Sequence, residues 1–391
     1  MSAMVRSILV AVALIGAIIA LAAIGWPASD YRDNDFFQFW AGPHALFEGA
    51  SPYDIAWSTA FHARYGSQAL HQPNLPAGFT TAYPLWTFVL LAPLALLPFE
   101  LAAPLWFVLQ AAAIALALAL VARYVLVTER RRDATLLAGL AIAFQPSWLA
   151  LVGGNITGAL FALLAGAVAA ALNGRERLLG ALLGVLIVKP QAFALLFWVL
   201  FIASRDRRRL IAGWVAVVAP LVAASFALRP GWFSEWLSIA SSLQSSAVSN
   251  ATAWTFDRAI GVVPPEALVA AMIGAWFVWW HMRRPGLRLL LGATVPASLF
   301  IAQRGWSYDQ LHLLVSVAVV LEVIAAARVR VAWLVILAAI TVVTPWALYV
   351  VAFQRGGEYL SALTPLLFFC LIVAADVAVR VRRRVVQTSV A

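Results

Sequence analysis

The sequence predicts an all-α integral membrane protein that crosses the bilayer many times, and its composition and its length carry this prediction. Of the 391 residues, 64% are hydrophobic and only 11% are charged, and the mean hydropathy is +0.91. An average soluble domain carries about 25% charged residues, so this chain lacks the polar surface that water requires. At about 20 residues per span, with short connections, roughly ten to thirteen transmembrane helices fit the length.

The basic residues predict how these helices are oriented. The formal net charge is +10, and every basic residue except Lys189 is an arginine. Most arginines form short clusters between apolar runs, such as those at 130–132, 205–209 and 380–384. Such clusters favour the cytoplasmic side of a membrane. We therefore predict a multi-pass protein of the inner or plasma membrane, in contact with membrane lipids, with cytoplasmic termini and no nucleic-acid partner.

Several functional classes are excluded by absent motifs. The single cysteine, Cys370, lies in an apolar run, which excludes a disulfide scaffold. The sequence has no CxxC, HExxH or phosphate-binding loop motif, and no GxGxxG that follows a strand. We accordingly expect no cofactor and no metal. Asn250-Ala251-Thr252 matches a glycosylation sequon, a match that three residues make often by chance.

We expect a single membrane domain over residues 1–391, built from four parts. Residues 7–26 form the first span, for which a cleaved signal peptide is the alternative. Residues 28–82 form a polar, acid-rich outer loop, whose aromatic pattern predicts short amphipathic helices on the outer membrane surface. The remaining spans occupy residues 83–380, and a basic cytoplasmic tail follows at 381–391.

The spans after the outer loop are delimited by prolines, glycines and arginine clusters. Pro98 divides the first apolar stretch into a short and a long helix, and a broken hairpin at 178–204 is expected to have two half-helices that meet at Lys189-Pro190. A second outer loop is expected at 229–262. The predicted segments are 83–97, 101–127, 134–150, 155–172, 178–204, 210–228, 264–282, 286–302, 309–326, 331–352 and 358–379.

Charges that appear against this pattern mark the candidate functional residues. Asp33 and Asp35 follow the first span among aromatic residues, where partial desolvation would make a carboxylate a better base. The alternative for either acid is a solvated helix cap. Position alone does not distinguish Asp35 from Asp33.

Three further residues could bind an anion. Lys189 is the sole charge in its apolar run, so we expect it either to meet a ligand anion and no internal carboxylate, or to snorkel from a turn near the interface. Arg304 could hold a phosphate with two hydrogen bonds, and His312 could donate a hydrogen bond or a proton. An ion pair between Arg304 and Asp309 is the alternative.

The order of several short motifs resembles a known family. Asp35-Phe36-x-x-Phe39-Trp40-Ala41 is followed by Leu46-x-x-Gly49-x-x-Pro52-Tyr53-Asp54, Tyr83-Pro84, Gly154-Asn155, Gly180-x-x-x-Gly184 before Lys189-Pro190, and Tyr308-Asp309-x-x-Leu311. Over residues 28–315 this order resembles the polyprenol-phosphate-mannose-dependent mannosyltransferases of glycosyltransferase family 87, in the GT-C superfamily.

The resemblance implies a GT-C fold and an inverting transfer of a hexose, mannose in that family, from a polyprenyl-phosphate donor to a lipid or glycan acceptor on the outer face. It implies that Asp35 is the general base. Lys189, Arg304 and His312 are then candidates for the donor phosphate, and Asp33, Tyr83, Asn155 and Asp309 are weaker candidates for substrate binding.

Two departures from the family pattern leave the sugar and the acceptor open. Tyr83-Pro84-Leu85 stands where the family has Tyr-Pro-Pro, and Gly153-Gly154-Asn155 stands where it has Gly-Gln-Asn. A polytopic lipid or sugar transporter, or a flippase, is the alternative function. It predicts inverted repeats and charges on several spans, neither of which the sequence displays.

Overall fold

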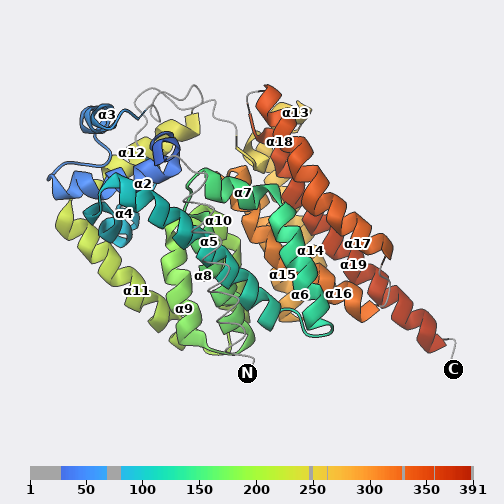
Figure 1. The fold of residues 1–391 in the computed structure, drawn as a ribbon. Helices are drawn as coiled ribbons and strands as arrows, with labels where there is room; N and C mark the ends of the chain where they lie inside the picture. The colour runs from blue at the N-terminus through green and yellow to red at the C-terminus, as the bar shows by residue number, and fades with distance from the viewer. Residues whose placement is uncertain are drawn as a thin grey trace, which may run out of the picture. The chain divides into compact units, whose positions relative to one another are not determined.

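The computed structural model describes residues 28–67, 81–245, 250–261, 263–327, 331–355 and 357–388. Within these ranges every regular element is a helix, which confirms the all-α prediction (Figure 1). The predicted first span at 7–26 lies outside the described residues. So does the part of the outer loop at 68–80.

Long apolar helices confirm the membrane class. Within the described ranges, five helical stretches are long and apolar enough to span a bilayer, and a bent pair makes a sixth. Shorter apolar helices at 85–96, 157–172, 190–203 and 287–301 accompany them. The total of ten to thirteen spans stays a prediction.

The described chain divides into two compact units. Unit 1 comprises residues up to Leu116 together with Leu149–Leu160 and Val215–Val248. Unit 2 comprises Ala117–Trp148, Phe161–Trp214 and Ser249–Ala391. The chain passes from one unit to the other inside α5, α7, α8 and α11, whose bounds are Phe99–Tyr124, Gln145–Val152, Thr157–Leu172 and Arg207–Leu228.

Unit 1 is built around the helix that follows Asn34. The side chain of Asn34 accepts a hydrogen bond from the Phe36 amide and so caps α2 (Asp35–Phe47). This helix packs against α4 (Leu85–Leu91), the 3₁₀ turn η3 (Ala92–Leu96) and α3 (Ile55–Arg64). Its first aromatic residues are fully buried, so α2 is a core helix of unit 1, whereas the sequence predicted an amphipathic helix. Its position relative to the membrane surface stays a prediction.

The aromatic residues of α2 explain this difference. Phe36 contacts Phe99 and Trp106 on α5, and Phe37 and Trp40 contact Phe61 on α3. Aromatic residues therefore face several neighbours around the helix, whereas an interfacial helix has a single apolar face. Pro98 separates η3 from α5, as expected from the sequence.

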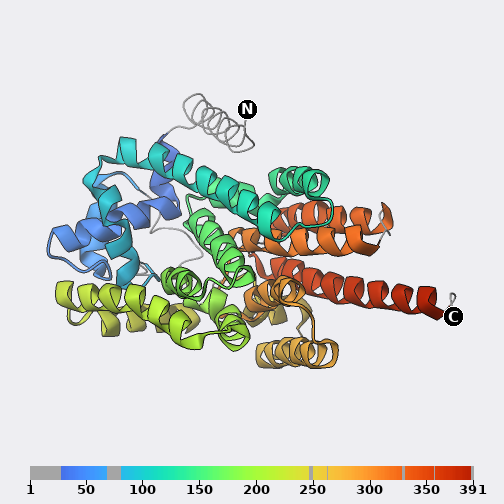
Figure 2. The ribbon, with the colours of Figure 1, turned by 90° about the horizontal axis from the view of Figure 1, so that it is seen from below.

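Unit 1 also contains α12 (Trp232–Ser245), which lies in the second predicted outer loop and packs against α4 (Figures 1 and 2). The structure thus finds a helix where the sequence predicted only a loop. A further short helix in that loop, α13 (Ala253–Ile260), belongs to unit 2.

Unit 2 is a helical bundle centred on α15 (Leu287–Ile301), in which the stretch from Leu290 to Phe300 is entirely buried. This helix packs against α10 (Pro190–Ala203), α14 (Pro265–Arg283), α16 (Leu314–Ala327) and α19 (Leu363–Thr388). The orange and red helices run side by side in both ribbon views (Figures 1 and 2). The last helix continues through much of the predicted basic tail.

Two of the predicted apolar segments are divided by a helix break, and only one of these two breaks was predicted. As expected, α9 (Glu176–Val185) and α10 are half-helices, joined by the 3₁₀ turn η4 (Leu186–Val188) and Lys189. The predicted single span at 134–150 is instead α6 (Arg130–Ala143) and α7, bent by 57° at Phe144. Pro146, in the first turn of α7, explains the bend, because within a continuous helix it would lack the amide that binds the Ile142 carbonyl and its ring would clash with that carbonyl.

The predicted span at 331–352 is also interrupted. It consists of α17 (Val331–Ala338), a π-helical turn η6 (Ala339–Val343) and α18 (Thr344–Arg355). The 3₁₀ turns η5 (Ser307–Leu313) and η7 (Tyr359–Ala362) precede α16 and α19.

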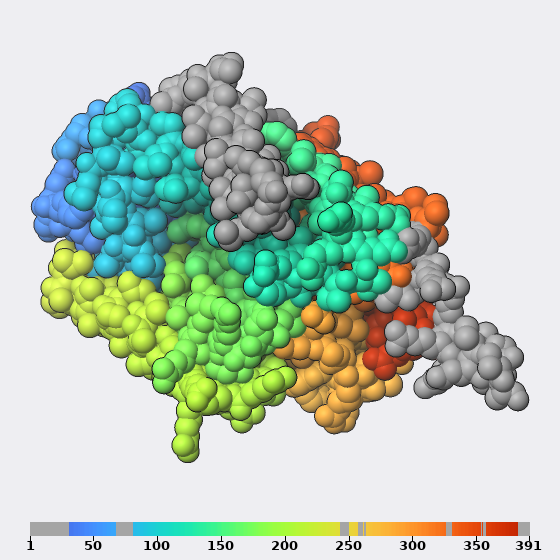
Figure 3. Space-filling model, turned by 60° about the horizontal axis from the view of Figure 1, so that its bottom comes forward, coloured from blue at the N-terminus to red at the C-terminus, as the bar shows by residue number. Residues whose placement is uncertain are grey.

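The space-filling view shows the green to yellow-green surface of α9, α10 and the start of α11 as continuous (Figure 3).

Candidate active site

Asp35 is the first residue of α2, and backbone contacts fix its position. Its amide donates to the Gly153 carbonyl at 3.0 Å, and Asn34 Nδ2 donates to the Val152 carbonyl at 3.0 Å. The positive end of the helix dipole stabilises negative charge in a first turn. Asp33 lies outside this arrangement as an exposed residue of η1 (Ala28–Asp33).

Both carboxylate oxygens of Asp35 accept hydrogen bonds from side-chain amides. Gln38 Nε2 donates to Oδ1 at 3.1 Å, and Asn155 Nδ2 donates to Oδ2 at 2.6 Å. The same Asn155 nitrogen lies 3.4 Å from the Tyr83 hydroxyl. Asp35, Tyr83 and Asn155, three residues selected from the sequence, therefore meet within unit 1. Half-buried Asp35 keeps access to an incoming group.

The turn at Gly153-Gly154-Asn155 needs its second glycine. Gly154 has a φ of +62°, and a Cβ there would lie 2.8 Å from both Asn34 Oδ1 and Phe36 Cβ. Only glycine combines this backbone conformation with so close an approach. Asn155 is held from its other end, because its Oδ1 accepts from the amide and the hydroxyl of Thr157 at 3.1 and 2.6 Å.

A second layer of contacts holds residues 81–83, which the sequence did not connect to Asp35. Thr81 Oγ1 donates to Gln38 Oε1 at 3.1 Å, Tyr53 Oη donates to the Tyr83 carbonyl at 2.9 Å, and Trp236 Nε1 donates to the Ala82 carbonyl at 2.8 Å. Burial raises the pKa of the Tyr53 phenol, which keeps it a proton donor. Gln38 could have been found from the sequence, since it lies three residues after Asp35 on one helical face.

Helix α12 is anchored by a carboxylate. Glu235 accepts two hydrogen bonds from the Arg229 guanidinium at 2.8 Å each, and one from the Ser51 hydroxyl at 2.6 Å. The hydrogen bond from Arg229 lowers the pKa of Glu235 and raises that of Arg229. Ser51 belongs to the first of the two predicted outer loops, so this group joins these two segments within unit 1.

In unit 2 Lys189 forms an ion pair that the sequence did not predict. Its Nζ lies 2.7 Å from Asp309 Oδ1, and the two side chains are 7% and 4% exposed. The ammonium also lies 4.8 Å from the centre of the Tyr308 ring. The expectation that Lys189 meets no internal carboxylate is therefore wrong. Asp309 instead fulfils the need of a buried cation for an opposite charge.

His312 lies next to this pair. Its Nδ1 donates to the Asp309 carbonyl at 2.6 Å, because a carbonyl can only accept, and Phe161 and Phe193 pack against the ring edge-on. Nε2 is buried and has no hydrogen-bond partner in the part of the chain that the structure describes. In this tautomer Nε2 is an acceptor, so a phosphate contact by His312 would require a second proton.

Arg304 has a different environment. It is half-buried between α15 and η5, and no carboxylate among the described residues pairs with it. Burial lowers its pKa to about 10, which leaves the guanidinium charged at neutral pH. The alternative ion pair between Arg304 and Asp309 does not form, since Asp309 pairs with Lys189. Arg304 is thus the predicted cation best able to accept an external anion.

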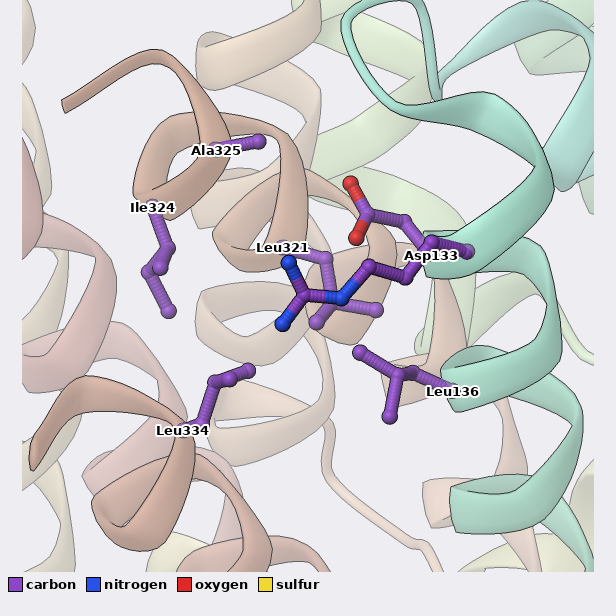
Figure 4. Close-up of a pocket in the computed structure, with 7 residues that line it drawn as sticks. Asp133, Leu136, Leu321, Ile324, Ala325 and Leu334 are labelled. Atoms are coloured by element: carbon purple, nitrogen blue, oxygen red, sulfur yellow. The ribbon is translucent and has the colours of Figure 1, made fainter. Parts of the chain in front are cut away.

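The glycosylation sequon and a small cavity belong neither to the group around Asp35 nor to the group around Lys189. The glycosylation sequon is buried, with Asn250 5% and Thr252 1% exposed, so this asparagine is inaccessible in the folded chain. A small cavity lies between α6, α16 and α17 (Figure 4). Its lining is mostly aliphatic, beside the charged Arg132 and Asp133, and it includes no predicted site residue. Within the described ranges, no group of three His, Cys, Asp or Glu could hold a metal ion.

Comparison with known proteins gives one family. The sequence model described as glycosyltransferase family 87 matches residues 79–303. The matched range includes Tyr83, Asn155 and Lys189, and it ends before Arg304, Asp309 and His312. Asp35 also lies outside it. No curated protein matches the chain. The match covers more than half of the sequence and favours a transferase over a transporter or flippase.

Proposed function

We propose, from the premise that this chain belongs to glycosyltransferase family 87 and is therefore a membrane glycosyltransferase, that it moves a hexose from a polyprenyl-phosphate donor to a lipid or glycan acceptor. The proposed sugar is mannose, by resemblance to the family. The proposed reaction takes place on the outer face of the cell membrane. The observation that carries the proposal is the oriented carboxylate of Asp35.

Asp35 acts as the general base in this proposal. It takes the proton from an acceptor hydroxyl while the oxygen attacks the anomeric carbon of the donor sugar. The new bond forms as the bond between that carbon and the phosphate oxygen breaks, so the configuration inverts. The amides of Gln38 and Asn155 support this role because they fix the direction of both carboxylate oxygens.

The leaving group needs positive charge, since negative charge grows on the departing polyprenyl phosphate. Arg304 is proposed as the principal phosphate ligand, because it is charged, half-buried and without a carboxylate partner in the described chain. Lys189 can also contribute to phosphate binding, but its ammonium then interacts with the phosphate and with the Asp309 carboxylate at the same time. His312 would assist in its protonated form. Asp33, Tyr83, Asn155 and Asp309 remain the weaker candidates for substrate binding, and we propose no cofactor for the reaction.

The test is to replace Asp35 by asparagine. This change keeps the size of the side chain and leaves the Asn34 cap in place but removes basicity, so turnover should fall by at least ~100-fold with normal expression. The assay would follow labelled mannose from a polyprenyl-phosphate donor into a membrane extract that contains acceptors. Asp33→Asn is the comparison and should lower transfer far less than Asp35→Asn does. Loss of activity in Asp33→Asn, with activity kept in Asp35→Asn, would assign the base to Asp33.

A further inference from the structure

Two hydrogen-bonded chains leave the Asp35 carboxylate and end in the same short segment. From Oδ1 the first runs through Gln38 to Thr81. From Oδ2 the second runs through Asn155 to the Tyr83 hydroxyl. Residues 81–83 are therefore a common support for both oxygens. A displacement of this segment would alter both amide donors together.

The backbone of this segment is held from outside by two donors. Tyr53 holds the Tyr83 carbonyl, and Trp236 holds the Ala82 carbonyl. Trp236 is the contact made from the second outer loop, some 154 residues away along the chain. The carbonyls of residues 82 and 83 thus receive hydrogen bonds from two separate parts of the sequence.

Helix α12, which carries Trp236, is itself held in place by polar and aromatic contacts. Glu235, next to Trp236, is bound by Arg229 and Ser51. One turn earlier, Trp232 is 1% exposed and contacts Trp86, Phe226 and Trp236. The indole of Trp236 therefore extends from a helix anchored by both an ion pair and a buried aromatic cluster.

We infer that Trp236 is a positioning residue for Asp35, acting through residues 81–83 and the amides of Gln38 and Asn155. The inference rests on the proposed function, in which Asp35 is the base. A general base works only when its oxygen meets the acceptor hydroxyl at hydrogen-bond distance. A misplacement of about 1 Å can cost ~100-fold in rate, so one lost support among several should have a smaller but measurable effect.

The chain offers a matched pair of tryptophans for the test. Trp236→Phe removes the indole N–H that binds Ala82 and keeps an aromatic ring. Trp232→Phe, one turn away on the same helix, removes an N–H that donates no hydrogen bond among the described residues. Both substitutions remove similar volume from α12. Only the first removes a hydrogen bond to residues 81–83.

The measurements are kcat, the KM for labelled polyprenyl-phosphate mannose, the pH–rate profile and the thermal unfolding midpoint. For Trp236→Phe we expect a ~3- to 10-fold lower kcat, since one hydrogen bond is lost. We also expect a nearly unchanged KM and an acidic limb moved towards higher pH. Trp232→Phe should lower kcat less than Trp236→Phe does, because a phenyl ring still packs in the aromatic cluster and no hydrogen bond to residues 81–83 is lost. Tyr53→Phe should change kcat and the acidic limb in the same direction as Trp236→Phe.

Two outcomes would contradict the inference. One is an equal loss of kcat in both tryptophan variants, and the other is a Trp236→Phe variant that loses stability but keeps the wild-type kcat and pH profile. Asp35→Asn, assayed in parallel, separates this failure from that of the proposed function. Substantial transfer by Asp35→Asn would contradict the proposed function itself. An inactive Asp35→Asn beside a kinetically normal Trp236→Phe would contradict the inference alone.

Discussion

At the scale of single residues, the pairing of Lys189 changes what its removal should do. A buried ion pair is a weak source of net stability, but loss of one partner leaves the other charge uncompensated. Asp309 is 3% exposed and also caps η5 by accepting from the Trp306 amide. Lys189 therefore contributes to the fold of unit 2, whatever its part in the proposed phosphate binding.

We predict that Lys189→Ala destabilises the protein by about 3–5 kcal/mol, the usual cost of breaking a buried pair. A large part of this loss should be recovered in Lys189→Ala combined with Asp309→Asn, because the stranded charge is removed. Thermal unfolding in detergent measures both effects. If Lys189→Ala were to keep its unfolding midpoint while donor affinity fell, Lys189 would be a direct phosphate ligand.

Arg304→Ala provides the complementary residue-scale prediction. Since no described carboxylate pairs with Arg304, its removal strands no charge, and the unfolding midpoint should stay within a degree or two of wild type. Donor binding should weaken by about 2–4 kcal/mol, the range for truncating one side of a charged contact. Titration with the polyprenyl-phosphate donor measures this loss. Unchanged donor affinity would remove Arg304 from the phosphate site.

At the scale of elements, α9 and α11 pack closely through two glycines. A Cβ on Gly180 would lie 1.9 Å from the Leu210 carbonyl oxygen, and one on Gly213 would lie 2.1 Å from that of Arg177. Both obstacles are backbone atoms, which cannot rotate away. Small residues allow membrane helices to approach in this way. Gly180 belongs to the Gly180-x-x-x-Gly184 motif of the sequence, and the close packing of α9 on α11 explains why this position needs a glycine.

We predict that Gly180→Ala lowers stability by about 1–3 kcal/mol or more, because the added methyl group forces the two helices apart. Gly274→Ala is the control, since a Cβ at this position in α14 has nothing within 4 Å. It should be neutral or slightly stabilising, as alanine favours helix over glycine. Equal unfolding midpoints for the two variants would show that α9 and α11 tolerate separation.

Helix α12 should show a pH-dependent contribution to stability. The pKa of Glu235 is lowered from its ordinary value of 4.5, so its contribution is fully present above that pH and is lost as the pH falls through the lowered pKa. Glu235→Gln should therefore unfold at a lower temperature than wild type at pH 7, and the difference should shrink as the pH falls below 4.5. Glu266→Gln, an exposed acid of α14 outside any described ion pair, should show no such convergence.

The elements also show where sequence reasoning succeeds and where it stops. Proline and glycine act locally, so the breaks at Pro98 and Lys189-Pro190 could be predicted. The bend at Phe144 was missed although Pro146 was visible, because the apolar run continues through it. The two central contacts, Asn155 with Asp35 and Lys189 with Asp309, each join residues 120 positions apart. No spacing rule reaches that far, so the resemblance could supply the residues but not their partners.

At the scale of the whole molecule, two compact units each contain a part of the proposed chemistry. The candidate base and its amide donors belong to unit 1, while the candidate cations belong to unit 2. The family match runs through both units, from residue 79 to residue 303. That the chain forms a single membrane domain stays a prediction. Its orientation in the membrane is predicted from the distribution of charged residues, and this orientation can be tested directly.

We predict that the first outer loop faces the cell exterior or periplasm and that the arginine cluster at 205–209 faces the cytoplasm. Ser67 would be a poor reporter of the outer side because it is 2% exposed. Ala60 in α3 and Arg208 in α11 are exposed and suit the purpose. Single cysteines at these positions, in a Cys370→Ala background, should react with an impermeant thiol reagent from opposite sides of sealed vesicles. Labelling of both from one side would contradict the positive-inside orientation and would remove the assignment of Asp35 to the outer face.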